Sequence, residues 1–275
     1  MQNFDWLLKV GPKQGLLYFM KHLSDEGFEN LQQIYRVSQA RTTDLQKGTN
    51  LTLTVPGYED IEAHWYKQLR ENNVPDYSVY DSDFYLSEAW ACWVVYSRNY
   101  LRNLPMPRFL DPDGVMEDMR PVKRIADLGC GIAYSTAGLK QLFSDAEVVG
   151  TNLPDTKQTK LAKSVARRVG FEIAYSEKEL GKVDALLASE YFEHFEEPIT
   201  HLIDVLEYLE PRTLLVANSF NVDSIGHFDY YLVACERLTG KETAKIFSET
   251  MRDYGYEKIK TRFWNNRPNY WRLKK

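Results

Sequence analysis

From Val122 onward the sequence alternates between short apolar runs and longer amphipathic stretches, and this alternation restricts the folds open to the chain. Amphipathic stretches at 135–143, 155–169 and 198–209 have the periodicity of helices that bury one face. The apolar runs, each a predicted strand, cover residues 122–128, 147–152, 171–175, 183–189 and 213–220. The last two are apolar throughout, as expected of central parallel strands covered on both faces. The pattern predicts an α/β fold on a mostly parallel sheet.

The end of the chain departs from this alternation. Residues 229–238 and 241–251 predict two helices, and 257–264 and 269–273 predict strands that a four-residue turn would join into an antiparallel hairpin. From residue 251 the chain is also basic and aromatic. This mixture fits edge strands with charged outer faces, and it equally fits a surface that meets phosphate and stacks on a base.

Before residue 121 the periodicity is helical. It is clearest in 84–101, where aromatic and aliphatic side chains recur every three or four residues. Such a stripe favours a packed core over a substrate-lining role. We therefore expect two regions, a mainly helical one over 1–120 that caps the substrate site, and the sheet domain over 121–275.

Composition and charge limit the kinds of binding partner to expect. Hydrophobic residues make up 44% of the chain and charged residues 27%, which is typical of a folded globular protein. The net charge of −5 provides no overall attraction for nucleic acid, although a local contact stays possible. Three widely spaced cysteines favour a reducing, cytoplasmic setting, and we expect no membrane association because no apolar run approaches ~20 residues.

The segment with the most specific chemistry runs from Asp127 through Gly129, Cys130 and Gly131. It connects a predicted strand to a predicted helix. Glycines are needed there because the turn is tight, and because a side chain on the second one would keep a ligand away from the main chain. Asn152 ends the next strand, near the ~20-residue spacing expected for a partner of a ribose hydroxyl.

These residues resemble the first motif of class I S-adenosylmethionine (SAM)-dependent methyltransferases, over roughly 122–275. The resemblance implies a Rossmann-like, seven-stranded, mostly parallel sheet with an antiparallel C-terminal hairpin, and SAM as the cofactor. Two positions differ, since Ala133 replaces a third glycine and Asn152 replaces an acidic residue. The cofactor-binding residues that the resemblance implies are Asp127, Gly129, Cys130, Gly131, Asn152, Leu153 and Ser189.

Candidates for proton transfer follow the fourth and fifth predicted strands. Glu190 and His194 stand where ligands bind in a doubly wound sheet, and His227 lies in a polar loop after the fifth strand. Each also has a structural interpretation, as a helix cap for the first two and as a loop-stabilising hydrogen bond for His227. No metal-binding motif is visible among the histidines. The predicted substrate-binding residues are Tyr191, Asn221, Tyr230 and Arg267.

The sequence thus favours a SAM-dependent methyltransferase acting on an N, O or C nucleophile of a small polar or aromatic metabolite or a nucleoside. One alternative is a non-catalytic subunit of a nucleic-acid modification complex that binds SAM or S-adenosylhomocysteine (SAH). A nicotinamide-dependent oxidoreductase is a third, which the missing third glycine disfavours.

Overall fold

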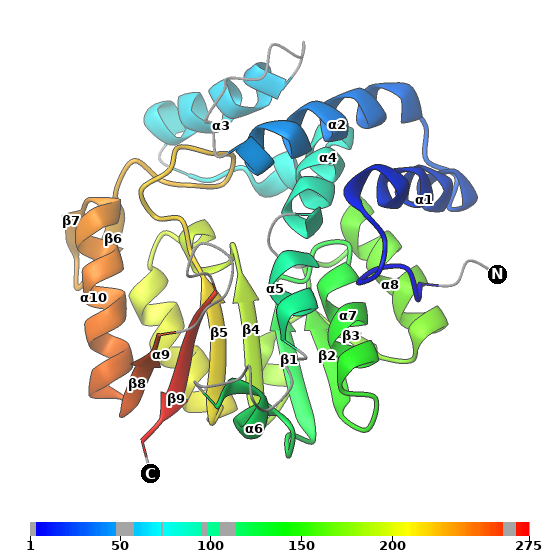
Figure 1. The fold of residues 1–275 in the computed structure, drawn as a ribbon. Coiled ribbons are helices and arrows are strands. Elements are labelled where there is room, and N and C mark those ends of the chain that lie inside the picture. Colours follow the sequence, from blue (N-terminus) through cyan, green and yellow to red (C-terminus); the bar gives the residue numbers. More distant parts are fainter. Residues whose placement is uncertain are drawn as a thin grey trace.

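A computed structural model describes residues 4–47, 58–72, 74–94, 98–104, 114–260 and 268–274. The described part of the N-terminal region is helical; its first helices lie over one end of the sheet, and its last short helix lies near the other end (Figure 1). Its helices are α1 (Pro12–Asp25), α2 (Leu31–Lys47), α3 (Tyr58–Asn72), the 3-10 turn η1 (Tyr77–Asp81), α4 (Asp83–Cys92), α5 (Arg98–Asn103) and α6 (Val115–Met119).

The sheet has seven strands in the order β3-β2-β1-β4-β5-β9-β8, and β9 runs antiparallel between β5 and β8. The α/β prediction, with its mostly parallel sheet and C-terminal hairpin, is therefore confirmed. The strands are β1 (Arg124–Leu128), β2 (Glu147–Thr151), β3 (Glu172–Ala174), β4 (Ala185–Ser189), β5 (Thr213–Ala217), β8 (Tyr256–Ile259) and β9 (Asn269–Leu273).

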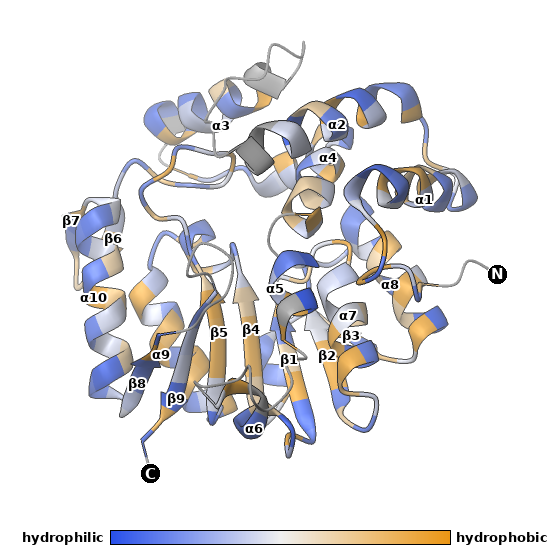
Figure 2. Ribbon diagram, viewed as in Figure 1, coloured by the Kyte–Doolittle hydropathy of each residue, from blue (hydrophilic) through white to orange (hydrophobic). Residues whose placement is uncertain are grey.

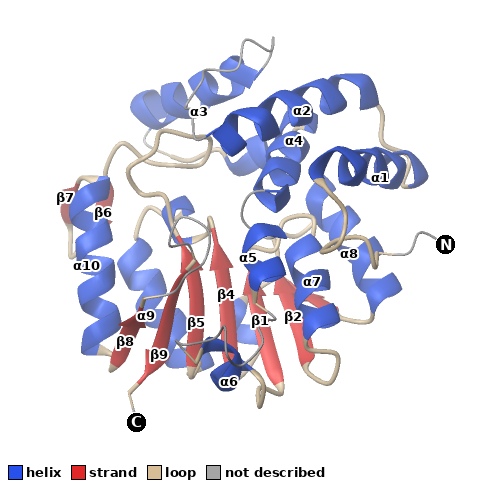
Figure 3. Ribbon diagram, in the orientation of Figure 1, coloured by secondary structure: helices blue, strands red, loops and turns tan. Residues whose placement is uncertain are grey.

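Further helices pack against the sheet, and Figure 3 distinguishes them from its strands by colour. They are α7 (Tyr134–Leu142), α8 (Lys157–Val169), α9 (Pro198–Leu209) and α10 (Gly240–Asp253), with the short 3-10 turns η4 (Glu177–Glu179) and η5 (Phe192–His194). The start of α8 corrects one expectation, since Thr156 rather than Asp155 is its N-cap and accepts a hydrogen bond from the Thr159 amide. Asp155 has a left-handed backbone, with φ of 59°, and lies one residue before the cap.

One predicted helix is also wrong in type. Residues 229–238 form a small hairpin, β6 (Tyr231–Val233) and β7 (Glu236–Leu238), because Ala234 and Cys235 both adopt positive φ and make a two-residue turn. Within the helix expected over 84–101, the structure describes α4, two residues of π-helix at 93–94, and α5, and residues 95–97 lie outside the described part.

The aromatic stripe of α4 is core, as predicted. Trp90 and Trp93 are buried and pack with Phe19 of α1 and Tyr134 of α7. One apolar cluster therefore includes residues of the N-terminal helices, of α7 and of α8. Apolar residues are dense along β1, β4 and β5 in Figure 2. None of the described helices is both long enough and apolar enough to cross a membrane.

Candidate functional site

Two adjoining cavities lie where the glycine turn after β1 meets the end of β4. The cap-side cavity, of about 290 Å³, extends under α2 and α4, and the β2-side cavity, of about 330 Å³, extends toward β2 and β3. Both volumes are near those of small-molecule sites. The residues that line both are Tyr85, Gly129, Gly131, Gln158, Glu190 and His194.

The glycine turn forms the floor between the cavities. Gly129 and Gly131 have φ values of 60° and 56°, a region that favours glycine. A Cβ at Gly131 would meet Gln158 Oε1 at 3.1 Å and no other atom within 4 Å, so its cavity side is open. The turn is anchored to β2, because the Cys130 amide donates to the Thr151 carbonyl at 2.9 Å and the Gly129 amide donates to Thr151 Oγ1 at 3.0 Å.

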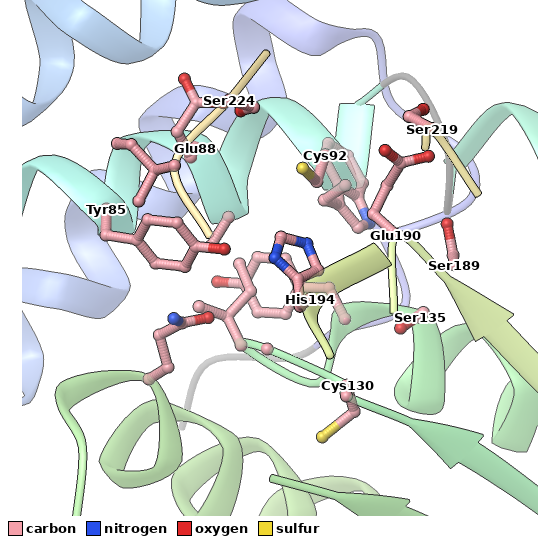
Figure 4. A pocket seen from close by; sticks show the side chains of 18 of the residues that line it. Tyr85, Glu88, Cys92, Cys130, Ser135, Ser189, Glu190, His194, Ser219 and Ser224 are labelled. Atoms are coloured by element: carbon pink, nitrogen blue, oxygen red, sulfur yellow. The ribbon is translucent and has the colours of Figure 1, made fainter. Parts of the chain in front are cut away.

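The Cys130 thiol points away from the cavities. The Cys130 Sγ lies 2.8 Å from the place where a Cβ on Gly150 of β2 would be, so it packs beneath the turn. Figure 4 shows the same direction. Burial raises the pKa of the Cys130 thiol well above its usual value. This thiol is therefore a packing group at neutral pH.

Asp127 is a buried carboxyl at the end of β1. Its Oδ2 accepts hydrogen bonds from Ser135 Oγ at 2.6 Å and Thr136 Oγ1 at 2.7 Å, both at the start of α7. Burial raises the pKa of Asp127 to about 6, against the opposing effect of these two bonds. Asp127 lines the cap-side cavity, so its carboxyl both anchors α7 and faces the site.

Asn152 has a structural role in addition to its predicted role in cofactor binding, and its sequence position does not reveal it. Its Nδ2 donates to the Gly131 carbonyl at 2.6 Å, and its Oδ1 accepts from the Leu153 amide at 3.0 Å. The amide group thereby ties the end of β2 to the glycine turn. Asn152 and the half-exposed Leu153 both line the β2-side cavity.

Ser189 provides an independent indication of a bound ligand. This last residue of β4 lines the cap-side cavity, and its buried Oγ has no hydrogen-bond partner among the described residues. Buried hydroxyls are ordinarily hydrogen-bonded. A polar ligand beside the glycine turn would meet this requirement.

Tyr191 lies on the β2 side of the site. Its ring covers Gly129, where a Cβ would approach Tyr191 Cδ2 to 2.5 Å. Its hydroxyl donates to Glu177 and lies 2.9 Å from His201 Nε2. Tyr191, Glu177 and Tyr175 line the β2-side cavity, which is the part nearest β2 and β3.

Glu190 lies where the two cavities meet. It has a left-handed backbone with φ of 51°, an uncommon conformation for glutamate that often marks a functional position. Behind it, Glu193 is fully buried and its Oε1 accepts from the Ser219 amide at 2.6 Å. Burial, and then the charge of Glu190, raise the pKa of Glu193 well above its usual value. Glu193 therefore holds its proton more tightly than an exposed glutamate does.

His194 and His227 form a second pair. Their rings are 4.9 Å apart and edge to face, and Tyr80 OH lies 2.9 Å from His194 Nδ1. Burial, with a contribution from His227, lowers the pKa of His194 well below its usual value. Burial lowers the pKa of His227 to about 4. Both imidazoles are therefore neutral at pH 7.

The tautomer of His227 follows from its surroundings. His227 Nδ1 lies 2.6 Å from the Val222 carbonyl, which can only accept a hydrogen bond. The proton is therefore on Nδ1 and the lone pair on Nε2. Trp65 of α3 fixes the same loop by donating from Nε1 to the His227 carbonyl at 2.5 Å.

The N-terminal helices contribute residues that sequence reasoning missed. Arg41 of α2 pairs with Glu88 of α4, with 2.9 Å between Nε and Oε1, and both line the cap-side cavity beside Tyr85 and Cys92. Figure 4 shows Tyr85, Glu88 and Cys92 along one helix, opposite Glu190 and His194. Arg41 and Glu88 are 47 residues apart, so no local pattern predicts their pairing.

Two of the predicted substrate residues are not brought into the site. Asn221 and Tyr230 line neither cavity, and Tyr230 is 55% exposed. Arg267 lies outside the described residues. The described residues contain no group of three His, Cys, Asp or Glu side chains able to hold a metal ion.

No family model and no curated protein matches the sequence. The chain is similar to solved methyltransferase structures. An O-methyltransferase family protein from Burkholderia thailandensis is 14% identical over 80% of this chain and 73% of its own, with a TM-score of 0.48. The SAM-dependent methyltransferase SibL is 15% identical over 95% and 75%, with a TM-score of 0.45.

The N-terminal domain of EvdMO1, solved with SAH bound, is 16% identical over 57% of this chain and 77% of its own, with a TM-score of 0.39. This chain's own strands define its fold. The sheet order is β3-β2-β1-β4-β5-β9-β8 with β9 reversed, and a glycine turn follows β1. The chain has the Rossmann-like, seven-stranded sheet with a reversed β9 that the resemblance to class I SAM-dependent methyltransferases implies.

Proposed function

We propose that this protein is a SAM-dependent methyltransferase, with its cofactor over the glycine turn and its methyl acceptor in the cap-side cavity. The observation that carries the proposal is the open face of Gly131 beside the unsatisfied Ser189 hydroxyl, at the junction of two cavities. The residues fit a ligand that has both a charged and a ribosyl end. Asp127, Ser189 and the open face of Gly131 would hold one end, and Asn152, Leu153 and Tyr191 would surround the other.

A bound sulfonium cofactor would supply a methyl group that is already electrophilic. The protein's contribution is then mainly to position the acceptor and exclude water. Tyr85 and Glu88 of α4 close the cap-side cavity over the end of β4. His227 can accept a hydrogen bond from the acceptor at Nε2, and His194 can orient it beside Glu190.

The acceptor that we propose is a small polar or aromatic metabolite or a nucleoside. The cap-side cavity mixes polar groups with the aromatic rings of Tyr85 and Trp93. Its modest volume favours a small acceptor over a polymer. A non-catalytic SAM- or SAH-binding subunit is the second candidate, because Asn152 places a neutral amide where this fold commonly has a carboxylate.

Calorimetric titration with SAM, SAH and NAD tests the cofactor. We expect wild type to bind SAM and SAH but not NAD. We expect Gly131→Val to lose at least tenfold in affinity, since its side chain would enter the cavity and strain the positive φ. Gly170→Val is the matched control, because Gly170 also has a positive φ but nothing within 4 Å of a Cβ and lines neither cavity. A folded wild type that binds neither SAM nor SAH contradicts the proposal.

Turnover separates the enzyme from the binding subunit. SAH release from SAM in the presence of metabolite pools should be measurable for wild type. Glu190→Gln and His227→Ala should each reduce it at least tenfold if these side chains contact the acceptor. Tight SAH binding with no turnover of any acceptor favours the non-catalytic subunit.

A further inference from the structure

The amide group of Asn152, which the sequence predicts to meet a ribose hydroxyl, is already used inside the protein. Its Nδ2 donates to the Gly131 carbonyl at 2.6 Å, and its Oδ1 accepts from the Leu153 amide at 3.0 Å. These bonds join the glycine turn to the end of β2, so turning the amide toward a ligand would break them. A ribose in the β2-side cavity therefore needs another acceptor for its hydroxyl protons.

Gln158, the second residue of α8, lies over the same glycine turn. It is 6% exposed and lines both cavities. Its Oε1 lies 3.1 Å from the place where a Cβ on Gly131 would be. Among the described residues, no group donates a hydrogen bond to this oxygen. Buried amide oxygens ordinarily have a donor, so a ligand that supplies one would complete the site.

The N-terminal region fixes which end of the Gln158 amide group faces the turn. Gln158 Nε2 donates to the Tyr80 carbonyl at 3.5 Å, and a carbonyl can only accept a hydrogen bond. The opposite orientation of the amide group would place two acceptors against each other. Tyr80 is held beside α8, because the next residue, Asp81, accepts from the Lys157 amide at 2.7 Å. Gln158 Oε1 is therefore directed toward Gly131.

The carboxyl groups that line the two cavities each have a hydrogen-bond partner within the described part of the chain. These pairs are Asp127 with Ser135, Glu88 with Arg41, Glu177 with Tyr191, and Glu190 with Glu193. Gln158 differs from these carboxyls because its Oε1 has no donor and because its amide group is neutral at any pH. A contact between Gln158 and a hydroxyl therefore does not depend on the protonation of any of them.

We propose that Gln158 Oε1 accepts a hydrogen bond from a ribose hydroxyl of the cofactor, the role that the sequence assigns to Asn152. This inference rests on the proposed function, because it requires a ribosyl ligand over the glycine turn. Asn152 then affects the ligand only through the turn that it holds in place. The Tyr80 carbonyl is a positioning group, which keeps the Gln158 oxygen directed toward the ribose.

Two ligands that differ only in the ribose hydroxyls test this contact. Wild type, Gln158→Met and Asn152→Ala are each titrated calorimetrically with SAH and with 2′,3′-dideoxy-SAH. We expect wild type to bind SAH at least tenfold more tightly than the dideoxy analogue. Gln158→Met keeps the length of the side chain but removes the amide group, so it should bind SAH about tenfold more weakly and the analogue as wild type does. Asn152→Ala should weaken both ligands by the same factor, because it loosens the turn.

Gln141→Met is the matched control. Gln141 lies on α7 and donates from Nε2 to the Phe4 carbonyl at 2.8 Å, so it also joins a helix beside the sheet to the N-terminal region. It lines neither cavity, and its replacement should leave both affinities unchanged. Gln158→Asn keeps the amide group but is one methylene shorter, and it provides a second test if Gln158→Met does not fold. It should lose the same preference for SAH over the analogue.

The outcomes separate this inference from the proposed function. If wild type does not bind SAH, the proposed function fails and the inference fails with it. If wild type binds SAH and the dideoxy analogue equally, or if Gln158→Met weakens both ligands equally, the inference alone is overturned. A loss confined to SAH in Asn152→Ala also overturns it, since Asn152 would then be the ribose partner.

Discussion

At the scale of single residues, the buried Asp127 carboxyl is the clearest case of a group held at a cost to stability. Its folded pKa of about 6 lies above the ordinary value of 3.8. The folded state therefore binds the Asp127 proton more tightly than the unfolded state does. The stability that this proton contributes is complete below pH 3.8 and is lost as pH rises through 6. At neutral pH the site holds an ionised carboxylate in a dry environment, where hydroxyls of Ser135 and Thr136 offset part of the cost.

Asp127→Asn should remove this pH dependence. Relative to wild type, the variant should gain about 2 kcal/mol in unfolding free energy between pH 4.5 and pH 7.5. Urea unfolding at the two pH values measures the change, and Asp145→Asn, at an exposed position, should show none. An equal stability difference at both pH values would contradict the buried, ionised Asp127. Weaker SAM binding by the same variant would show that the Asp127 carboxylate contributes to cofactor binding.

The pH dependence that His22 gives to stability is opposite to that of Asp127. It is buried in α1, where its Nδ1 lies 2.8 Å from Tyr134 OH of α7. Burial, with a contribution from Arg168, lowers its folded pKa to about 4 from 6.5. The unfolded state binds more protons between these values, so stability is complete above pH 6.5 and falls as pH decreases toward 4.

The burial of neutral His22 should lower the unfolding free energy of wild type by about 2 kcal/mol as pH falls from 7.5 to 5. His22→Gln should flatten the pH dependence of unfolding free energy by that amount. Wild type measured in the same buffers is the reference. An unchanged slope in His22→Gln would mean that His22 is not buried in its neutral form.

At the scale of elements, α3 and the loop after β5 are held together by main-chain contacts. Tyr66 OH donates to the Ser224 carbonyl at 3.2 Å and accepts from the Ser224 amide at 3.1 Å. Trp65 binds the His227 carbonyl three residues later. Helix α3 therefore positions the loop that carries a candidate proton acceptor, which links the N-terminal region to the site.

Tyr66→Phe should destabilise this loop. Loss of both hydrogen bonds should cost about 1 to 2 kcal/mol and increase amide exchange at 222–228. Tyr208→Phe, at an exposed tyrosine of α9, should change neither quantity. If amide exchange in Tyr66→Phe increases in α3 alone and not at 222–228, Tyr66 does not position the loop.

At the scale of the whole molecule, the helical region and the sheet share one core. Tyr134 of α7, with Leu161 and Val165 of α8, packs in the same cluster as Trp90 and Phe19 of the N-terminal helices. The two predicted regions are therefore distinct in secondary structure but joined by buried contacts. Removing either one would expose apolar surface on the other.

A fragment of residues 114–275 should not fold stably on its own. We expect a non-cooperative thermal transition and binding of a hydrophobic dye, because the apolar faces of α7 and α8 lose their cover. The full chain measured in parallel is the control. A fragment that melts cooperatively and binds SAH would show that the sheet region is an independent domain.

SAH should stabilise both parts of the chain. At a concentration of 100 Kd it should add about 2.7 kcal/mol to the unfolding free energy. Hydrogen exchange should slow at 85–92 of α4 as well as at 129–131, since both segments line the cap-side cavity. Protection of the glycine turn alone would indicate that the helices do not close over the ligand.

Local patterns were sufficient for most of the sheet and for the glycine turn. Continuous apolar runs predicted β4 and β5, and the glycines between β1 and α7 showed where the backbone needed positive φ. These features depend on residues close in sequence, so periodicity and turn chemistry reveal them. The same reasoning failed at 229–238, where the turn at Ala234 and Cys235 gave a hairpin instead of a helix.

The composition of the site depended on contacts that are distant in sequence. The pairing of Arg41 with Glu88, the covering of Gly129 by Tyr191 and the approach of Tyr80 to His194 each join separate elements. A single sequence records residue types but not which side chains become neighbours, since burial and pKa are set by the packed environment. The sequence therefore pointed to the edge of the sheet where the candidate site lies, and tertiary packing decided its charge, its tautomers and its walls.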